Sequence, residues 1–158
     1  MILLVLRHGK AEKDSPTGRD VDRPLMKRGE RQAEYIREKL ADGDGVARPE
    51  VILSSRAMRA RATAEIVAKG LGREVEFEEA LTLGTPFSEA MELVRRLAGA
   101  GRAVLIVGHN PQFEDLVTAL TGEEQEMRTG EMVALDVRAE GKHLAAREIG
   151  RERLGEDD

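Results

Sequence analysis

The segment ILLVLRHG, residues 2–9, sets the fold class of this 158-residue chain. Its five consecutive apolar residues, 2–6, are typical of a strand that is buried on both faces of a parallel sheet. A second run of this kind, AVLIV, covers residues 103–107, and a shorter one, VIL, covers residues 51–53. Three such runs predict a central sheet whose two faces are both covered by helices.

Helical segments separate these strands. Residues 27–41, 56–69 and 85–97 carry apolar side chains at the i, i+3, i+4 spacing of a helix face. Gly43 and Gly72 stand where the first two helices are expected to stop. The alternation of strands and helices predicts an α/β domain, a three-layer sandwich with a mostly parallel central sheet.

The C-terminal third predicts one more helix and a hairpin. Asn110 is expected to be the N-cap of that helix, with Pro111 at its first position and Gly122 after its end. Residues 131–137 and 143–149 are separated by a turn and predict an antiparallel hairpin at the margin of the sheet.

Length and composition limit the possible functions. The length favours one domain, residues 1–149, followed by a polar tail at residues 150–158. The net charge of −5 argues against nucleic-acid binding, whose affinity comes mostly from neutralising phosphates. The chain has no Cys and no apolar run near the ~20 residues that a membrane span requires. We therefore expect a cytoplasmic protein with no secretory leader and no membrane association.

Cationic and imidazole side chains follow the predicted strands. They are Arg7, His8, Arg56, Arg59, Arg61 and His109. Ligands of open α/β sheets bind beyond the carboxyl ends of the strands, so these side chains are expected at one edge. The chain has 19 Arg and only 6 Lys, and guanidinium is the planar, bidentate partner of a phosphoryl group. The pattern predicts a binding site for an anion.

Other chemistries lack a sequence signature. Neither of the glycine-rich motifs that cradle nucleotide phosphates occurs. His8, His109 and His143 are not spaced as zinc ligands, so no metal and no other cofactor is expected, and His143 is expected at the surface. Ser54 and Ser55 lack the context of a hydrolase nucleophile.

Four motifs together resemble the histidine phosphatase superfamily. They are Leu6-Arg7-His8-Gly9, Asp22-Arg23-Pro24-Leu25 with Arg28-Gly29, Ser55-x-x-x-Arg59-Ala60-x-x-Thr63-Ala64 and Val107-Gly108-His109-Asn110-Pro111. Met26, Arg56 and Ala62 depart from the residues that are usual in the family at these positions. The chain is most similar to the short SixA-type phosphohistidine phosphatases, because little sequence is left for the substrate lid of mutases and sugar bisphosphatases.

The resemblance implies a phosphoglycerate-mutase-like fold and a metal-independent phosphatase. His8 would attack phosphorus and form a phosphohistidine, and we expect a backbone carbonyl to hold its other ring nitrogen. Arg7 and Arg59 would hold the phosphoryl oxygens, while a protonated His109 would stabilise the developing charge. Further contacts to phosphate or substrate are expected from Gly9, Arg23 and Asn110.

The substrate implied by the SixA resemblance is phosphohistidine on a partner protein of a phosphorelay or phosphotransfer system. The candidate general acids are Glu78 and Glu79, but Ala80 stands where the family's acid aligns best. Two alternatives stay open: a small-molecule phosphomonoesterase with Glu79 as its acid, and a non-catalytic module that binds a phosphorylated ligand. The sequence leaves the roles of Arg56 and Arg61 open.

Overall fold

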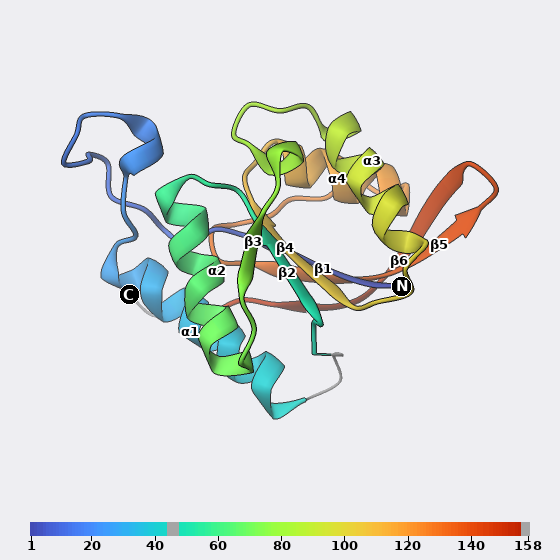
Figure 1. Cartoon of the computed structure of the whole chain (residues 1–158), viewed down its shortest axis with the longest axis horizontal. Helices are drawn as coiled ribbons and strands as arrows, with labels where there is room; N and C mark the ends of the chain where they lie inside the picture. The colour runs from blue at the N-terminus through green and yellow to red at the C-terminus, as the bar shows by residue number, and fades with distance from the viewer. Residues whose placement is uncertain (44–47, 156–158) are drawn as a thin grey trace.

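A six-stranded sheet lies between two pairs of helices in the computed structural model, which describes residues 1–43 and 48–155 (Figure 1). The strand order is β3-β2-β4-β1-β5-β6. The parallel strands are β1 (Ile2–Arg7), β2 (Val51–Ser54), β3 (Val75–Phe77) and β4 (Val104–Gly108). The antiparallel strands are β5 (Met132–Glu140) and β6 (His143–Glu152). The predicted mostly parallel sheet with a C-terminal antiparallel hairpin is confirmed.

Each face of the sheet is covered by two helices, which confirms the predicted three layers (Figure 1). One face carries α1 (Lys27–Asp42) and α2 (Met58–Leu71), and the other carries α3 (Phe87–Ala98) and α4 (Gln112–Thr121). Two short 3-10 turns complete the elements, η1 (Asp20–Asp22) and η2 (Glu79–Leu81). In the described residues, no helix has the length and apolar character that crossing a bilayer requires.

The central strands explain the apolar run at the start of the chain. Every residue from Leu3 to Leu6 is fully buried, and alternate side chains belong to two different apolar clusters. Leu3 shares one cluster with Phe113 of α4, whereas Leu4 shares the other with Ile36 of α1. A strand with helices on both faces has no solvent side, so its sequence shows no alternation.

Helix ends follow the glycine signals. Gly43, Gly72 and Gly122 come directly after α1, α2 and α4, and all three adopt the left-handed conformation with φ of 70°, 65° and 76°. Side chains with a Cβ adopt this conformation rarely, which makes glycine the usual residue at a helix end of this type. These three predicted helix ends are confirmed.

The start of α4 differs from the prediction. The helix begins at Gln112 with Pro111 at the N-cap position, so the expected N-cap role of Asn110 is wrong. Asn110 instead donates a hydrogen bond from Nδ2 to the carbonyl oxygen of Met127, 2.8 Å away. The side chain is drawn across to the loop between α4 and β5, a contact that local sequence does not reveal.

The end of β6 also differs. The strand continues to Glu152, which pairs with Met132 of β5, so residues 150–152 belong to the sheet and not to a polar tail. β6 is an edge strand, and an edge strand with a solvated face can be rich in charged residues. Residues 156–158 of the expected tail lie outside the described residues. His143 is exposed as predicted, although it opens β6.

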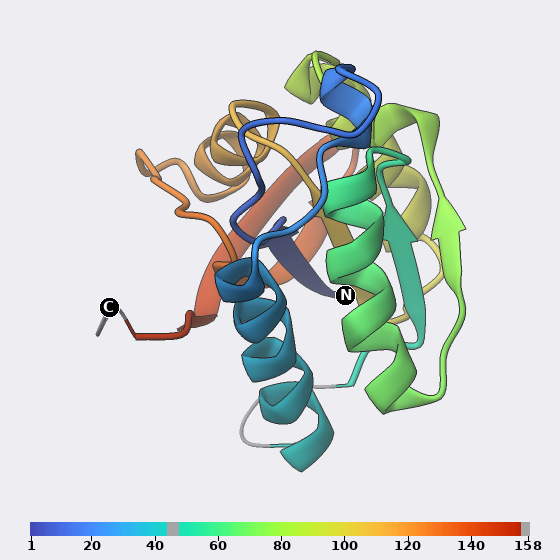
Figure 2. The same ribbon diagram turned by 90° about the vertical axis from the view of Figure 1, so that its left-hand side faces the viewer.

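The fold leaves the carboxyl ends of β1, β2 and β4 at one edge of the sheet. The long segment between β1 and α1 passes over this edge, and its η1 turn packs against α2 (Figure 2). The loop between α4 and β5 borders the same edge, because Gly130 donates its N–H to the carbonyl oxygens of Arg7 and His8 at 3.1 and 2.9 Å.

Candidate active site

His8 and His109 follow two neighbouring strands. β1 and β4 pair in parallel with Arg7 opposite Gly108, and the backbone N–H of His8 donates to the carbonyl oxygen of Gly108 at 3.0 Å. The two imidazole rings lie edge to face with centroids 5.2 Å apart. His8 is 8% exposed and His109 is 2% exposed, so the sheet edge holds two histidines side by side with little access to water.

The hydrogen bond of His8 fixes its tautomer. Nδ1 lies 2.7 Å from the carbonyl oxygen of Gly9, the kind of acceptor that was expected. Because a carbonyl only accepts, Nδ1 carries the proton and Nε2 keeps its lone pair. Burial lowers the pKa of His8 to about 4, against the opposing effect of the Gly9 hydrogen bond, and the charges of Arg59 and Arg7 lower it further. His8 is therefore neutral at pH 7, as a nucleophilic nitrogen must be.

His109 is held through only one of its ring nitrogens. Nε2 lies 2.8 Å from Oγ of Ser55, whereas Nδ1 is buried and has no hydrogen-bond partner among the described residues. Burial is the main cause that lowers the pKa of His109 to about 3, and electrostatic interactions with His8 and with the guanidinium of Arg59 lower it further. Without a bound anion His109 is therefore neutral at pH 7, because burial and nearby cations both disfavour a further positive charge, and the protonated form that is expected during the reaction stays a prediction.

Two buried hydroxyls tie the site to α2. Oγ of Ser55 also accepts the N–H of Ala57 at 3.2 Å, which orients it toward His109. Oγ1 of Thr63 accepts the N–H of Gly9 at 3.1 Å and donates to the carbonyl oxygen of Arg59 at 2.7 Å. Ser55 and Thr63 belong to a motif that was quoted from the sequence, but their residue types alone did not predict a role for them.

Arg59 and Arg23 share one carboxylate. Arg59 is 3% exposed and donates from Nη1 to the backbone carbonyl of Asp20 at 2.9 Å and from Nη2 to Oδ2 at 3.1 Å. Arg23 donates from Nε to Oδ1 of Asp20 at 2.9 Å. The hydrogen bond from Arg23, together with that from Arg59, lowers the pKa of Asp20. Asp20 has no local sequence signal, because its partner Arg59 lies far along the chain.

Arg7 is oriented by a backbone carbonyl. Its Nη1 donates to the carbonyl oxygen of Met127 at 3.1 Å, and the same oxygen accepts Nδ2 of Asn110. Nε of Arg7 is buried without a hydrogen-bond partner among the described residues, and burial lowers the pKa of the guanidinium. Arg7 and His109 thus each present one buried nitrogen that is still able to bond.

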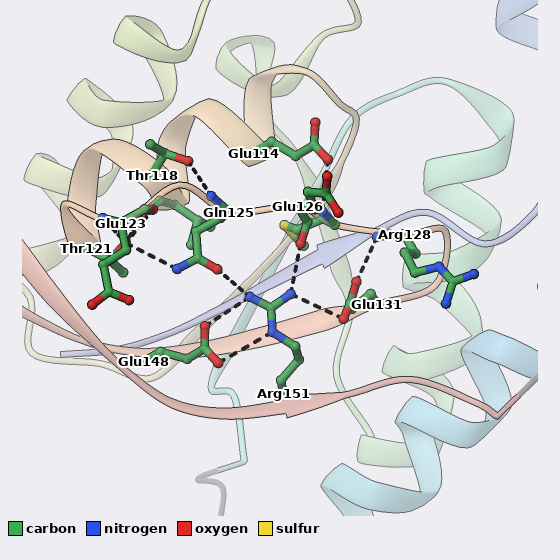
Figure 3. Close-up of polar contacts among 12 residues, drawn as sticks. Glu114, Thr118, Thr121, Glu123, Gln125, Glu126, Arg128, Glu131, Glu148 and Arg151 are labelled. Carbon is green, nitrogen blue, oxygen red and sulfur yellow. Dashed lines mark hydrogen bonds and ion pairs between the residues drawn. The ribbon is translucent and has the colours of Figure 1, made fainter.

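The loop that carries Met127 is anchored by Arg151 of β6 (Figure 3). The guanidinium of Arg151 donates to the carbonyl oxygen of Glu126 at 2.9 Å and to the carboxylates of Glu131 at 3.2 Å and Glu148 at 2.9 Å. The anchored loop sets the position of the carbonyl that orients Arg7. Arg151 was assigned to the tail by the sequence, so its role was missed.

Gly9 and Gly108 lie where other elements pack closely against the backbone. A Cβ on Gly9 would lie 2.5 Å from the carbonyl oxygen of Gly29 in α1, so the absence of a side chain allows the backbone of α1 to approach closely. Gly108 is similar, since a Cβ would meet the ring of Phe113 at 2.8 Å. Close contact between elements explains both glycines.

The candidate acids and two of the arginines lie apart from the histidines. Glu78 and Glu79 line a different pocket of about 520 Å³, and among the described residues no hydrogen bond or ion pair joins them to His8 or His109. Arg56 lies over the ring of Phe77, 4.9 Å from its centroid. Arg61 pairs with Glu65 at 3.7 Å on the surface of α2. Across residues 1–43 and 48–155, no group of three or more His, Asp or Glu side chains could hold a metal ion.

Comparisons with known proteins identify the family and the fold. Residues 3–82 match the histidine phosphatase superfamily (branch 1). No curated protein matches the sequence. A protein from Agrobacterium tumefaciens assigned as phosphohistidine phosphatase SixA is 29% identical, with a TM-score of 0.79 over 96% of both chains.

Two further solved structures share the fold at lower identity. The protein histidine phosphatase SixA complexed with tungstate is 23% identical, with a TM-score of 0.85 over 97% of both chains. A mycobacterial glucosyl-3-phosphoglycerate phosphatase complexed with VO3 is 19% identical, with a TM-score of 0.73 over 93% of this chain and 96% of that one. The match over residues 3–82 contains both the Arg7-His8-Gly9 and the Arg59 motifs, and the chain belongs to the histidine phosphatase superfamily (branch 1).

Proposed function

We propose that this protein is a phosphatase that forms a phosphohistidine on His8 and takes its phosphoryl group from phosphohistidine on a partner protein. Membership of the superfamily supports phosphatase chemistry. The observation that carries the proposal is the buried pair of histidines, in which Gly9 fixes Nδ1 of His8 and Nδ1 of His109 has no partner among the described residues. This arrangement offers one nucleophile and one further nitrogen for the phosphoryl group.

The first step transfers the phosphoryl group to the enzyme. Nε2 of His8 attacks phosphorus in line, and the bond to the leaving group breaks as the new P–N bond forms. Arg7 and Arg59 hold the phosphoryl oxygens. The arriving negative charge raises the pKa of His109, which takes up a proton and donates it as a hydrogen bond from Nδ1. Water then hydrolyses the phosphohistidine, which releases phosphate and restores neutral His8.

The leaving group favours phosphohistidine over an alkyl ester. An alkoxide leaves poorly and benefits from a general acid within hydrogen-bond reach, whereas a protonated imidazole leaves without such help. Glu78 and Glu79 line a different pocket, so the site is better suited to the second kind of leaving group. The SixA neighbours support the same substrate class. The arginines supply the positive charge, and we propose that no metal is needed.

The test compares wild type, His8→Ala and the control His143→Ala, which changes an exposed histidine of β6. Each is incubated with a phosphorylated phosphotransfer protein, an aryl phosphate and an alkyl phosphate, with and without a chelator. Wild type and His143→Ala should yield an acid-labile phosphoenzyme, and His8→Ala should yield none and lose at least about 10³-fold in turnover.

Three results would contradict parts of the proposal. Retained turnover in His8→Ala would exclude His8 as the nucleophile. Equal kcat/KM for the alkyl phosphate and the phosphohistidine protein would favour a small-molecule phosphomonoesterase, of the kind represented among the neighbours by the glucosyl-3-phosphoglycerate phosphatase. Loss of activity with the chelator would show that a metal takes part.

A further inference from the structure

A second cationic site adjoins the histidines through Arg7. This side chain lines a pocket of about 500 Å³, and Glu114 and Glu126 are the carboxylates in its wall. The cations in the wall are Arg7, Lys10, Arg28, Arg128 and Arg153. Five cations against two carboxylates give the pocket a positive balance in a chain whose net charge is −5.

The cations of this pocket come from four parts of the chain: the end of β1, α1, the loop between α4 and β5, and the residues beyond β6. Lys10 follows β1, and its backbone N–H donates to Oε1 of Gln32 in α1 at 2.9 Å. Nε2 of Gln32 donates to the carbonyl oxygen of Thr129 at 3.1 Å, and Nε of Arg153, beyond β6, donates to the same oxygen at 2.8 Å. Hydrogen bonds therefore hold these four parts of the pocket wall in fixed positions.

Two cations of the pocket, Arg7 and Arg153, are close enough to affect each other. Burial is the main cause that lowers the pKa of Arg7, and the positive charge of Arg153 lowers it further, while Glu114 opposes both. The guanidinium of Arg128 is directed away from the Arg151 network that anchors its loop (Figure 3). An anion that binds among these cations would reduce their mutual repulsion.

We infer that this pocket is the docking site for acidic side chains beside the phosphohistidine of the partner protein, an inference that rests on the proposed function. Arg7 belongs to both sites, so an anion in the pocket lies next to the phosphoryl group. Lys10 and Arg128 are exposed, and the cations come from four parts of the chain, which matches the spread-out charge of a protein surface. The overall negative charge of the enzyme would repel an acidic partner. A local positive patch attracts the acidic side of that partner and so orients it toward the site.

The test uses two phosphohistidine peptides that differ only in having Glu or Gln at the flanking positions. The ratio of their kcat/KM values is measured for wild type, Lys10→Glu, Arg128→Glu and Arg147→Glu. Arg147 is the matched control, because its side chain is 78% exposed and it lies on the β5–β6 hairpin. Wild type and Arg147→Glu should prefer the Glu peptide on the order of tenfold, and salt should reduce this preference. Lys10→Glu and Arg128→Glu should abolish it.

The outcomes separate this inference from the proposed function. Equal hydrolysis of both peptides by wild type, or a preference that survives both pocket variants, would overturn the docking site and leave the phosphohistidine substrate intact. Failure of wild type to hydrolyse either peptide would overturn both proposals. If the pocket variants instead lose turnover only of a phosphorylated hydroxy acid, the pocket binds the second anionic group of a small substrate, and a protein partner is the wrong occupant.

Discussion

Asp20 places a carboxylate where the proposed mechanism needs phosphoryl oxygens. Its Oδ2 accepts Nη2 of Arg59 at 3.1 Å and its Oδ1 accepts Nε of Arg23 at 2.9 Å. The backbone carbonyl of Asp20 separately accepts Nη1 of Arg59, so the peptide group can orient this guanidinium without the carboxylate. The carboxylate therefore competes with an incoming anion for the same two arginines.

Removal of this charge should strengthen phosphate binding. We expect Asp20→Asn to lower the inhibition constant of inorganic phosphate about two- to fivefold, since an exposed ion pair is worth up to about 1 kcal/mol. Asp22→Asn is the control, because Asp22 belongs to the same turn but accepts its hydrogen bond from Thr17. Phosphate inhibition should be measured for both variants at low salt. Unchanged or weaker inhibition in Asp20→Asn would show that the carboxylate orients the arginines and does not compete.

Sequence motifs predicted which cations and imidazoles meet, but not the groups that hold them. Four residues could be named from their places at strand ends, because Arg7 is the last residue of β1, His8 and His109 directly follow β1 and β4, and Arg59 lies soon after β2. Their partners are a hydroxyl, a backbone carbonyl and a carboxylate that reach the site through tertiary contacts: Ser55, Met127 and Asp20. Tertiary contacts of this kind leave no periodic signal in the sequence.

At the scale of elements, the loop between α4 and β5 links the edge strand to the site. Arg151 of β6 bonds to this loop through both Nη atoms, and the loop in turn supplies the Met127 carbonyl to Arg7. The planar fork of guanidinium suits this role, because one side chain bonds to several oxygens in fixed directions. β6 therefore affects the site without contacting His8.

Arg151→Lys should reveal this connection, because an ammonium keeps the charge but loses the fork. We expect about a tenfold loss in kcat/KM and a fall of about 1 kcal/mol in the free energy of unfolding, because the partly buried hydrogen bonds to Gln125 and Glu131 are lost. Arg147→Lys on the same strand is the control and should change neither quantity. Lower stability with unchanged kcat/KM and phosphate affinity would mean that Arg151 holds the loop without positioning Arg7.

The predictability of each element depends on how many of its faces are buried. β1, β4 and the helix ends at Gly43, Gly72 and Gly122 were predicted because burial and positive φ each restrict the residue type. The end of β6 was missed because an edge strand tolerates polar residues, so Gly150, Arg151 and Glu152 resemble a tail in sequence.

At the scale of the whole molecule, the site makes stability depend on pH. The pKa values of His8 and His109 are about 4 and about 3 in the folded chain, below the ordinary value of 6.5. The unfolded chain therefore binds more protons below pH 6.5, and the folded state loses stability as the pH falls from 6.5 toward 4. Each histidine contributes up to about 1.4 kcal/mol per pH unit in this window.

This dependence can be measured and then opposed with an anion. Urea unfolding at pH 7.5 and pH 5 should show a much smaller difference for the double variant His8→Asn/His109→Asn than for wild type, while His143→Asn should behave as wild type does. Sulfate remains a tetrahedral dianion over this range, and its binding favours the protonated histidines. Sulfate should therefore stabilise wild type more at pH 5 than at pH 7.5, because binding of the dianion is coupled to proton uptake. If the double variant keeps the pH dependence of wild type, the buried histidines do not cause the pH dependence of stability. If sulfate stabilises wild type equally at both pH values, binding of the dianion is not coupled to protonation of these histidines.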